Sequence, residues 1–439
     1  MNKRLIDNFS LGKDFYIIQF SEFLYSVGLR SIQFALAWWI LTITNDPTVF
    51  SFFVTVALIS DVISRCFLGW LGDVYSKKLL IEICYFVSLI FSIFIAALTA
   101  MQLYIFGVLF LCQCIIGFSI GIREPIQSSI IVSLVDRSQI AEAVRWRAMV
   151  LTMASFVAPL FGTVLISYVE PIGTMYIGIA ITLIALIALR FVSLGTTENE
   201  ANKDKLTNGS WYSGIKVVYK LPPEKFLAKV SFLINLGLCS IFGFILPVYF
   251  QKNFSESPWL LGVVEISFAI GLFIGASKVN LFLNSFYGRA RSTFFSYIVS
   301  GVGILFISLI SKNLPEYSYW YFVPVCMIFM FVGIGIATAT INSNFLRTVA
   351  TPKSYLNRVN AAALFCSGLA APVGIALTGY AYSFLDPFVV FLLLSLLLVI
   401  TSIFTCMSHE LKEALSLSDE RMDGFYSNRY PKVFIEEEK

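Results

Sequence analysis

Five polar side chains follow one another along an apolar stretch near the start of the chain. They are Gln19, Glu22, Ser26, Arg30 and Gln33. In a helix, at about 100° per residue, all five project within a sector about 80° wide. Such a stripe on an apolar helix is typical of a water-filled pathway; the alternative is an internal salt bridge that serves packing alone. In the pathway interpretation, Arg30 binds an anionic or carbonyl-rich solute, and Glu22 exchanges a proton or a cationic ligand.

The composition shows which kind of element must carry this stripe. Of the 439 residues, 58% are hydrophobic and only 13% are charged, about half the charged fraction of a soluble domain. The 42 Phe and 20 Tyr are more than one soluble core can bury. The net charge of +4 comes from the segments between apolar runs, so we expect a lipid bilayer around the chain and no nucleic-acid partner.

Apolar runs of about 20 residues, the length that crosses a bilayer as a helix, recur along the whole chain. We place six at 16–42, 49–71, 79–99, 102–122, 146–168 and 172–195, and six more at 226–250, 258–283, 291–311, 318–341, 359–383 and 386–408. A signal peptide is not expected, because the first run carries Glu22 and Arg30 and lacks a clear cleavage site. The polar stretch 196–225 suits a linker between two bundles, 16–195 and 226–408.

Basic residues are unevenly shared between the two sets of loops. The loops of one side hold Lys77 and Lys78, Arg137 and Arg145, five lysines between 203 and 225, Arg289 and Arg291, and Arg347, Lys353 and Arg358. The loops of the opposite side hold only Lys252 and Lys312. The positive-inside rule then predicts a cytoplasmic N-terminus at 1–15 and a cytoplasmic tail at 409–439, with a bacterial inner membrane as the expected location.

Asp61 and Glu265 also fall inside predicted spans, where an ionisable group costs about 2.5–3.5 kcal/mol and needs a partner or a wet cavity. Asp61 lies four residues before Arg65, within pairing distance on one helix face. With Glu22, these two acids are the candidates for proton coupling; for Asp61 the alternative is a structural pair, and for Glu265 a pair with a basic group on another helix. Weaker candidates for the solute pathway are Gln113, Asn235, Thr338 and Asn360.

A short polar loop, GWLGDVYSKK at 69–78, joins the second and third runs. Its length forces the two helices into an antiparallel hairpin, and Asp73 can accept hydrogen bonds from amides at a neighbouring helix N-terminus. We expect a cytoplasmic gate here; the alternative is an ordinary basic hairpin loop. The predicted gate residues are Gly69, Gly72, Asp73, Lys77 and Lys78, with Arg123 and Glu124 at the end of the fourth run.

The loop resembles the G-x-L-A-D-R-x-G-R-[KR] loop between helices 2 and 3 of the major facilitator superfamily. Gly69, Leu71, Gly72, Asp73, Lys77 and Lys78 are in register, whereas Val74 and Ser76 replace an arginine and a glycine. The resemblance extends from Tyr16 to about Met407. It implies an all-α membrane protein of twelve transmembrane helices, arranged in two pseudo-symmetric six-helix bundles. A faint repeat agrees with this arrangement, because 127–144 aligns without gaps with 342–359.

Two further segments resemble the macrolide-efflux and siderophore-exporter branch of the superfamily: the first span and the stretch EPIQSSIIVSLVDRSQIAEAV. The fifth span, with Pro159 and Gly162, looks like a degenerate copy of the G-x3-G-P-x2-G-G element of superfamily antiporters. In the fourth span, Gly117 fits the family pattern R-x-x-Q-G, but Gln113 stands in place of its arginine, which departs from the standard arrangement for proton coupling.

The remaining reactive residues give no sign of an enzyme. All eight cysteines lie within or at the ends of apolar runs, the only histidine is His409, and no phosphate-binding loop or nucleophile constellation is visible. We expect no catalytic residue, metal or cofactor. The predicted function is a monomeric secondary transporter that exports a small amphipathic molecule, drug-like or siderophore-like, driven by a proton gradient. The alternatives are uptake of a metabolite or lipid, and a transport-inactive receptor or scaffold.

Overall fold

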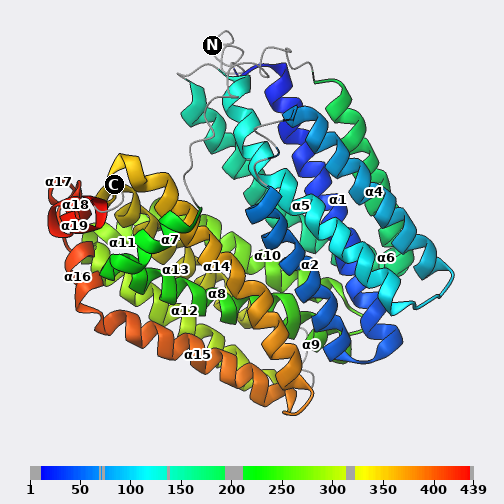
Figure 1. Ribbon diagram of the computed structural model, residues 1–439. Helices are drawn as coiled ribbons and strands as arrows, with labels where there is room; N and C mark the ends of the chain where they lie inside the picture. Colours follow the sequence, from blue (N-terminus) through cyan, green and yellow to red (C-terminus); the bar gives the residue numbers. More distant parts are fainter. Residues whose placement is uncertain are drawn as a thin grey trace, which may run out of the picture. The chain divides into compact units, whose positions relative to one another are not determined.

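The computed structural model describes residues 11–68, 71, 75–135, 139–192, 211–312 and 322–435, and the described residues are almost entirely helical (Figure 1). The chain divides into two compact units. Unit 1 comprises Met1–Leu206 with Ser255–Gly262, and unit 2 comprises Thr207–Phe254 with Val263–Lys439. The division falls within the segment predicted as the linker.

Unit 1 is built from five long helices. They are α1 (Lys13–Thr44), α2 (Pro47–Leu68), α4 (Lys77–Ala100), α5 (Phe106–Leu134) and α6 (Ile140–Arg190). The turn from α1 to α2 is tight because Asn45 adopts the left-handed conformation, with φ 48°, and its amide bonds to the carbonyl of Leu41 at 3.0 Å. Asparagine tolerates this conformation at a helix end, and Pro47 suits the first helical position that follows.

Unit 2 contains the other long helices and several short ones, except that residues 259–262, at the start of one of them, belong to unit 1. These helices are α7 (Trp211–Lys220), α8 (Pro222–Ser240), α9 (Leu246–Asn253), α10 (Trp259–Ile274), α11 (Asn280–Tyr287), α12 (Arg289–Ser311), α13 (Phe322–Ala350), α14 (Lys353–Tyr382), α15 (Pro387–Met407), α16 (His409–Leu415), α17 (Asp419–Met422), α18 (Phe425–Arg429) and α19 (Pro431–Ile435). Two π-helical turns, η3 (Ile241–Ile245) and η4 (Gly275–Val279), connect α8 to α9 and α10 to α11, so the seventh and eighth predicted spans are continuous but irregular.

Among the described residues, eleven helical segments are long and apolar enough to cross a membrane. The sequence predicts twelve, and the difference lies in α6, where one segment of 42 residues, Met149–Arg190, takes the place of two predicted spans. At about 1.5 Å per residue this segment is about twice the thickness of a bilayer core. Its backbone breaks at Glu170, with φ 60° and ψ 173°, directly before Pro171.

The contacts of α6 with α1 show that the chain reverses at this break. In order along α6, the neighbouring pairs are Arg147 with Glu22, Gly162 with Ser31, Gly178 with Gly28, and Ala185 with Ser21. The α1 partner therefore moves forward along α1 before Glu170 and backward after it. The two parts of α6 are antiparallel and both pack along α1, so they correspond to the fifth and sixth predicted spans.

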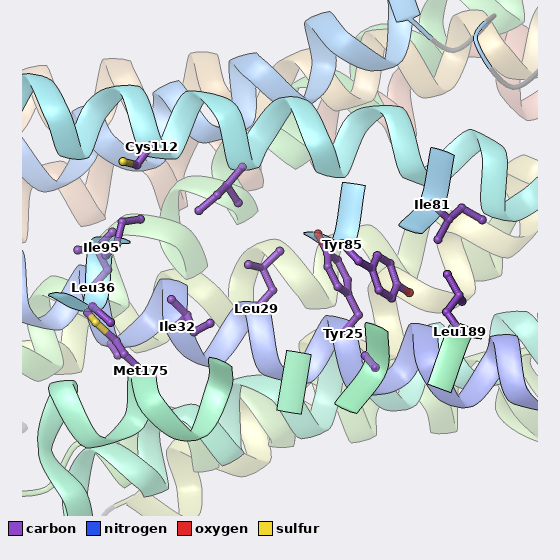
Figure 2. Packing of buried hydrophobic residues seen from close by; sticks show 14 of the residues in the cluster. Tyr25, Leu29, Ile32, Leu36, Ile81, Tyr85, Ile95, Cys112, Met175 and Leu189 are labelled. Atoms are coloured by element: carbon purple, nitrogen blue, oxygen red, sulfur yellow. The ribbon is translucent and has the colours of Figure 1, made fainter. Parts of the chain in front are cut away.

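The core of unit 1 forms around α1 (Figure 2). Leu29, Ile32 and Leu36 line the inner face of this helix at helical spacing and are nearly inaccessible to solvent. Tyr25 stacks on Tyr85 of α4, with ring centroids 4.0 Å apart and an angle of 13° between the planes. Because α1 is surrounded in this way, polar side chains on it are held in fixed positions by their neighbours.

Candidate functional site

The polar stripe of α1 does not face a single environment. Gln19 and Glu22 are buried, Ser26 and Gln33 are half-buried, and Arg30 is exposed. The first two members of the stripe point into unit 1, and the accessible part begins at Ser26. Whether the five residues line one pathway stays a prediction. The stripe lies at the border between the buried and the accessible face of the helix. A sector about 80° wide can include residues of both faces.

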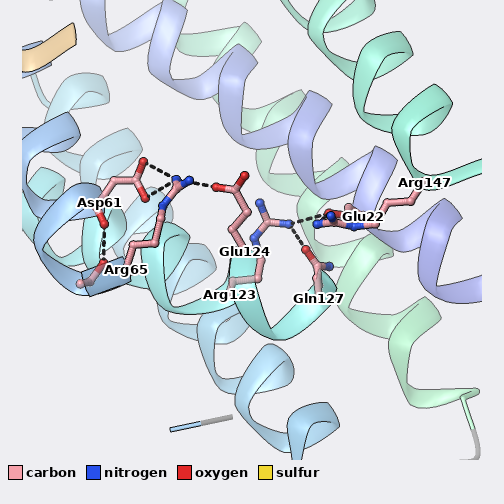
Figure 3. A network of polar contacts seen from close by, with 8 residues as sticks. Glu22, Asp61, Arg65, Arg123, Glu124, Gln127 and Arg147 are labelled. Atoms are coloured by element: carbon pink, nitrogen blue, oxygen red, sulfur yellow. Dashed lines mark hydrogen bonds and ion pairs between the residues drawn. The ribbon is translucent and has the colours of Figure 1, made fainter. Parts of the chain in front are cut away.

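Glu22 is the centre of a buried ion cluster that joins three helices (Figure 3). Its Oε1 lies 3.3 Å from Nη2 of Arg147 on α6 and 3.7 Å from Nη1 of Arg123 on α5. The glutamate side chain is 1% exposed. Arg30 is not its partner, although both lie on the same predicted stripe. Glu22 is thus ion-paired, with partners that come from other helices, and whether the pair serves packing alone stays a prediction.

Arg123 is fixed by neutral groups as well as by Glu22. Its guanidinium lies over the ring of Tyr25, 4.7 Å from the centroid, and its Nη1 donates a hydrogen bond to Oε1 of Gln127 one turn later. The amide of Gln127 in turn donates to the hydroxyl of Tyr85 at 3.0 Å. An arginine stacked on a ring and bonded at its edge has little rotational freedom.

A second, more exposed group of charges continues from this cluster along α5. Nη2 of Arg65 lies 2.9 Å from both carboxylate oxygens of Asp61 and 2.5 Å from Oε2 of Glu124, the neighbour of Arg123. Asp61 is therefore paired, as the i, i+4 spacing predicts. Together, Asp61, Arg65, Glu124, Arg123, Glu22 and Arg147 form a chain of six charges of alternating sign over α2, α5, α1 and α6 (Figure 3).

The predicted gate is visible only in part. Gly69, Gly72 and Asp73 lie outside the described residues. Lys78 donates a hydrogen bond to the carbonyl of Val192 at 2.5 Å and lies 3.7 Å from Glu82, and Lys77 is half-buried. Arg123 belongs to the Glu22 cluster and Glu124 to the Arg65 pair. Within the described residues, both are thus engaged inside unit 1, and whether they also contact Asp73 stays a prediction.

Several buried polar atoms in unit 1 have no hydrogen-bond partner among the described residues. Around Glu22 they are both amide atoms of Gln19, Oε2 of Glu22, Nε of Arg123 and Nε of Arg147. Elsewhere in the unit they are Oε1 of Gln113, Nε1 of Trp39, Oγ1 of Thr55 and Oγ of Ser92. Buried polar groups are normally bonded, and leaving one unpaired costs about 1–3 kcal/mol. The unpaired atoms around Glu22 leave its ion cluster with unused donors and acceptors, which a site needs if it is to exchange one set of contacts for another.

The candidates in unit 2 are spread over four helices. Asn235 and Asn360 are half-buried, and the amide of Asn235 bonds to the carbonyl of Ser231 at 2.8 Å. Thr338 is fully buried and its Oγ1 has no partner among the described residues. Glu265 is half-buried and takes part in an interaction. Among the described residues, Asn235, Asn360 and Thr338 form no hydrogen bond with one another, so the structure does not join these three as it joins the unit 1 residues.

Unit 2 has its own buried carboxylate, which the sequence interpretation missed. Oε2 of Glu224 lies 2.8 Å from Nε of Arg347, and its Oε1 accepts a hydrogen bond from the hydroxyl of Tyr426 at 3.0 Å. Arg147 of unit 1 was missed as well. A signal exists in each case: Arg147 falls in the first turns of a predicted span, and Glu224 follows two prolines, a pattern typical of a helix start, just before the predicted span 226–250. Their partners are distant in the sequence and could not be paired with them.

The described residues contain no cluster of three or more His, Cys, Asp or Glu side chains that could hold a metal ion. The seven cysteines whose side chains are described are unpaired thiols.

Comparison with known proteins identifies the family. The model of the major facilitator superfamily matches residues 19–374. No curated protein sequence matches the chain. Among solved structures, the nucleoside transporter NupG superposes with a TM-score of 0.67 at 17% identity, covering 90% of this chain and 99% of its own. A bacterial homologue of the iron transporter ferroportin, in an inward-facing state, gives 0.69 at 14% identity, covering 92% and 99%.

Likeness at this level of identity shows the fold, and the family match covers most of the sequence. Two units rich in long apolar helices, with charged residues buried inside them, agree with both results. The chain belongs to the major facilitator superfamily and is a multi-pass membrane transporter of a small molecule, not an enzyme.

Proposed function

We propose that this protein is a secondary active transporter that exports a small amphipathic compound with an anionic group, drug-like or siderophore-like, in exchange for protons. The observation that carries the proposal is Arg30. Its side chain is exposed near the middle of a membrane-crossing helix and has no hydrogen bond or ion pair to any described residue. A charge at this depth faces a water-filled cavity or the protein interior rather than lipid. Arg30 therefore marks a solvated pathway.

The neighbours of Arg30 favour recognition of an oxygen-rich group. Ser26 lies one turn before it and Gln33 one turn after it, and both are half-buried on the same side of α1. A guanidinium binds a carboxylate or phenolate through two parallel, charge-assisted hydrogen bonds, and the serine and glutamine supply further neutral ones. The apolar surface of the same helix provides contacts for the rest of an amphipathic molecule.

Glu22 supplies a means of coupling within unit 1. Protonation removes its negative charge and so weakens its contacts with Arg123 on α5 and Arg147 on α6. The arrival of a proton thus loosens α1 from two neighbouring helices, and its departure restores the contacts. Glu265 and Asp61 are the other candidates for proton transfer, and Asp61 shares Arg65 with Glu124.

The direction of transport rests on the resemblance of the first span to exporters, and the inner-membrane topology rests on the basic loops. The solved relatives are named for different cargoes, a nucleoside in one case and iron in another. The proposal of an organic anion therefore depends on Arg30 and not on these names.

Proteoliposomes with imposed pH gradients test the direction of coupling. We use pairs of amphipathic carboxylic acids and their methyl esters, and compare an acidic with an alkaline interior. Accumulation with an acidic interior supports exchange for protons. Accumulation with an alkaline interior supports uptake together with protons only where it exceeds that in protein-free liposomes, because weak acids collect passively on the alkaline side. Removal of the pH gradient must abolish the accumulation in both cases. If no pair shows gradient-dependent flux, the scaffold alternative is favoured.

Substitution of Arg30 tests the substrate class. We expect Arg30→Lys to impair transport of the acid because the planar two-pronged donor is lost while the charge is kept. Arg30→Ala should be worse and should remove the preference for the acid over its ester. An unchanged preference in Arg30→Ala contradicts the role of this residue in recognition.

Cysteine labelling tests whether the accessible stripe lines the pathway. In a background without native cysteines, Ser26→Cys and Gln33→Cys should react with a membrane-impermeant maleimide, and substrate should slow the reaction. Leu29→Cys, at a buried position that is 3% exposed, is the matched control and should stay unlabelled. If Ser26→Cys and Gln33→Cys are as unreactive as the control, the stripe serves packing.

A further inference from the structure

The last 27 described residues form a folded element that packs onto unit 2. This C-terminal cap (residues 409–435) consists of α16, α17, α18 and α19. Its apolar side chains share one buried cluster with α7, α8, α12, α13 and α14. The buried members from the cap are Leu411, Ala414, Leu415, Met422, Tyr426, Val433 and Phe434. The sequence predicts only a cytoplasmic tail here, because such short segments carry no clear helical period.

The helices of the C-terminal cap are too short to be stable by themselves. They contain four to seven residues each, far below the length at which an isolated helix is stable in water. The cap is therefore held by unit 2, and its docked state depends on a small number of contacts that can be lost together.

The central contact is the hydrogen bond from Tyr426 to Glu224. Glu224 lies in the first turn of α8 and Arg347 near the end of α13, and both are buried. Tyr426 is completely buried and covers this ion pair from the cap side. Burial, and then the neighbouring Glu224 carboxylate, raise the pKa of Tyr426 well above its ordinary value of 10, so the hydroxyl keeps the proton that it donates.

Two more bonds fix the cap at either side of this contact. The hydroxyl of Tyr355, on α14, donates to the carbonyl of Phe434 at 2.9 Å, and the two rings pack edge to face. The amide of Gly424 donates to the carbonyl of Val349, on α13, at 3.3 Å. The cap thus bridges α8, α13 and α14 at the end of unit 2 where α8 begins and α13 ends.

We propose that the C-terminal cap is a latch. When docked, it keeps water from the Glu224–Arg347 pair and holds the start of α8 and the end of α13 at one spacing; when released, it lets these two helix ends separate. The physical reason is that a buried ion pair is strong in a dry environment and weak in water. Docking of the cap therefore controls the strength of a link between two helices of the transporter that lie more than a hundred residues apart.

The test compares hydrogen–deuterium exchange in full-length protein and the variant Tyr426→Phe, which keeps the ring and removes the donor. No substrate is needed, so the result is independent of the proposed transport function. We expect peptides from 409–435, 222–230 and 343–350 to exchange faster together, by about tenfold or more, the size expected for losing a hydrogen bond to a charged group. Spin labels at the exposed positions Lys229 and Thr348 should report a broader and longer distance in this variant.

Two controls separate a latch from a passive cover. Tyr430→Phe removes a hydroxyl from a half-buried tyrosine of the same cap and should change none of the three regions. Tyr355→Phe removes a different cap contact, the bond to Phe434, without touching Glu224. If docking of the cap controls the link, this variant should speed exchange in the cap and in 222–230 together, and faster exchange in the cap alone would contradict the latch. If Tyr426→Phe accelerates exchange in the cap alone, or leaves the label distance as in wild type, the latch is refuted. Size-exclusion profiles identical to wild type exclude misfolding as the cause of a positive result.

Discussion

Each unit buries one glutamate against an arginine from the fourth span of that unit, but the two sites differ in completeness. In unit 2, both oxygens of Glu224 are bonded, at 2.8 Å by Arg347 and 3.0 Å by Tyr426. In unit 1, only one oxygen of Glu22 is engaged, at 3.3 and 3.7 Å, and the other has no partner among the described residues. The first arrangement is closed and suits a fixed link. The second has unused donors and acceptors, and so can rearrange at little cost.

The difference in completeness predicts a difference in stability, which is the largest effect we expect. Arg347→Met leaves Glu224 buried with only a neutral donor and should lower the free energy of unfolding by about 3–5 kcal/mol. Arg123→Met should cost less than half as much, because Glu22 keeps Arg147. Unfolding in mixed micelles, followed by circular dichroism, measures both variants.

A double variant checks the cause of this loss. Glu224→Leu with Arg347→Met removes both charges and should recover most of the stability, since an apolar pair of similar volume often replaces a buried ion pair without loss. Equal losses for Arg347→Met and Arg123→Met would show that the two clusters are equivalent and would remove the contrast between them.

The number, order and approximate bounds of the long helices could be predicted from the sequence, because hydrophobic runs and basic loops are local signals. Eleven helical segments cover the twelve predicted spans, and the two spans that merge in α6 still reverse at Glu170. The Asp61–Arg65 pair was also predictable, because both residues lie on one helix face. The partners of Glu22 and Glu224 could not be predicted. Residues as far apart in the sequence as Glu224 and Tyr426 are paired only by the way the helices pack around each other.

The second prediction concerns coupling and rests on the proposed function. Glu22→Gln should abolish proton-driven accumulation while downhill exchange continues, because binding and alternation do not need the proton. Glu224→Gln should retain accumulation, since the closed site has no part in coupling. Transport in the proteoliposomes described above distinguishes the two. Accumulation that persists in Glu22→Gln and is lost in Glu265→Gln would move coupling to unit 2 and reverse the comparison.

The third prediction uses the exposed end of the charge chain in unit 1. The side chain of Arg65 is 43% exposed although it lies close to two carboxylates. Arg65→Ala should therefore change the free energy of unfolding by only about 0.2–1 kcal/mol, and less at high salt. The same unfolding assay applies. A loss as large as that of Arg347→Met would mean that the outer charges are as essential to the fold as the buried cluster of unit 2.

The smallest expected effect is the response of the C-terminal cap to pH. The pKa of Tyr426 is raised in the folded protein, mainly by burial and then by Glu224. A group whose folded pKa lies above its unfolded value stabilises the fold fully below the unfolded pKa, about 10 for tyrosine, and loses this contribution only as the pH rises through the folded value. Deuterium uptake of residues 409–435, corrected for the intrinsic exchange rate, should thus be constant from about pH 7 to about pH 9. Tyr426→Phe should be equally flat but at faster exchange, because it lacks the donor at every pH. The contrary result is a fall in protection over this pH range in wild type that is absent from Tyr426→Phe. It would show that the Tyr426 hydroxyl titrates in this range, and that protons reach the Glu224 site of unit 2 as readily as the Glu22 site of unit 1.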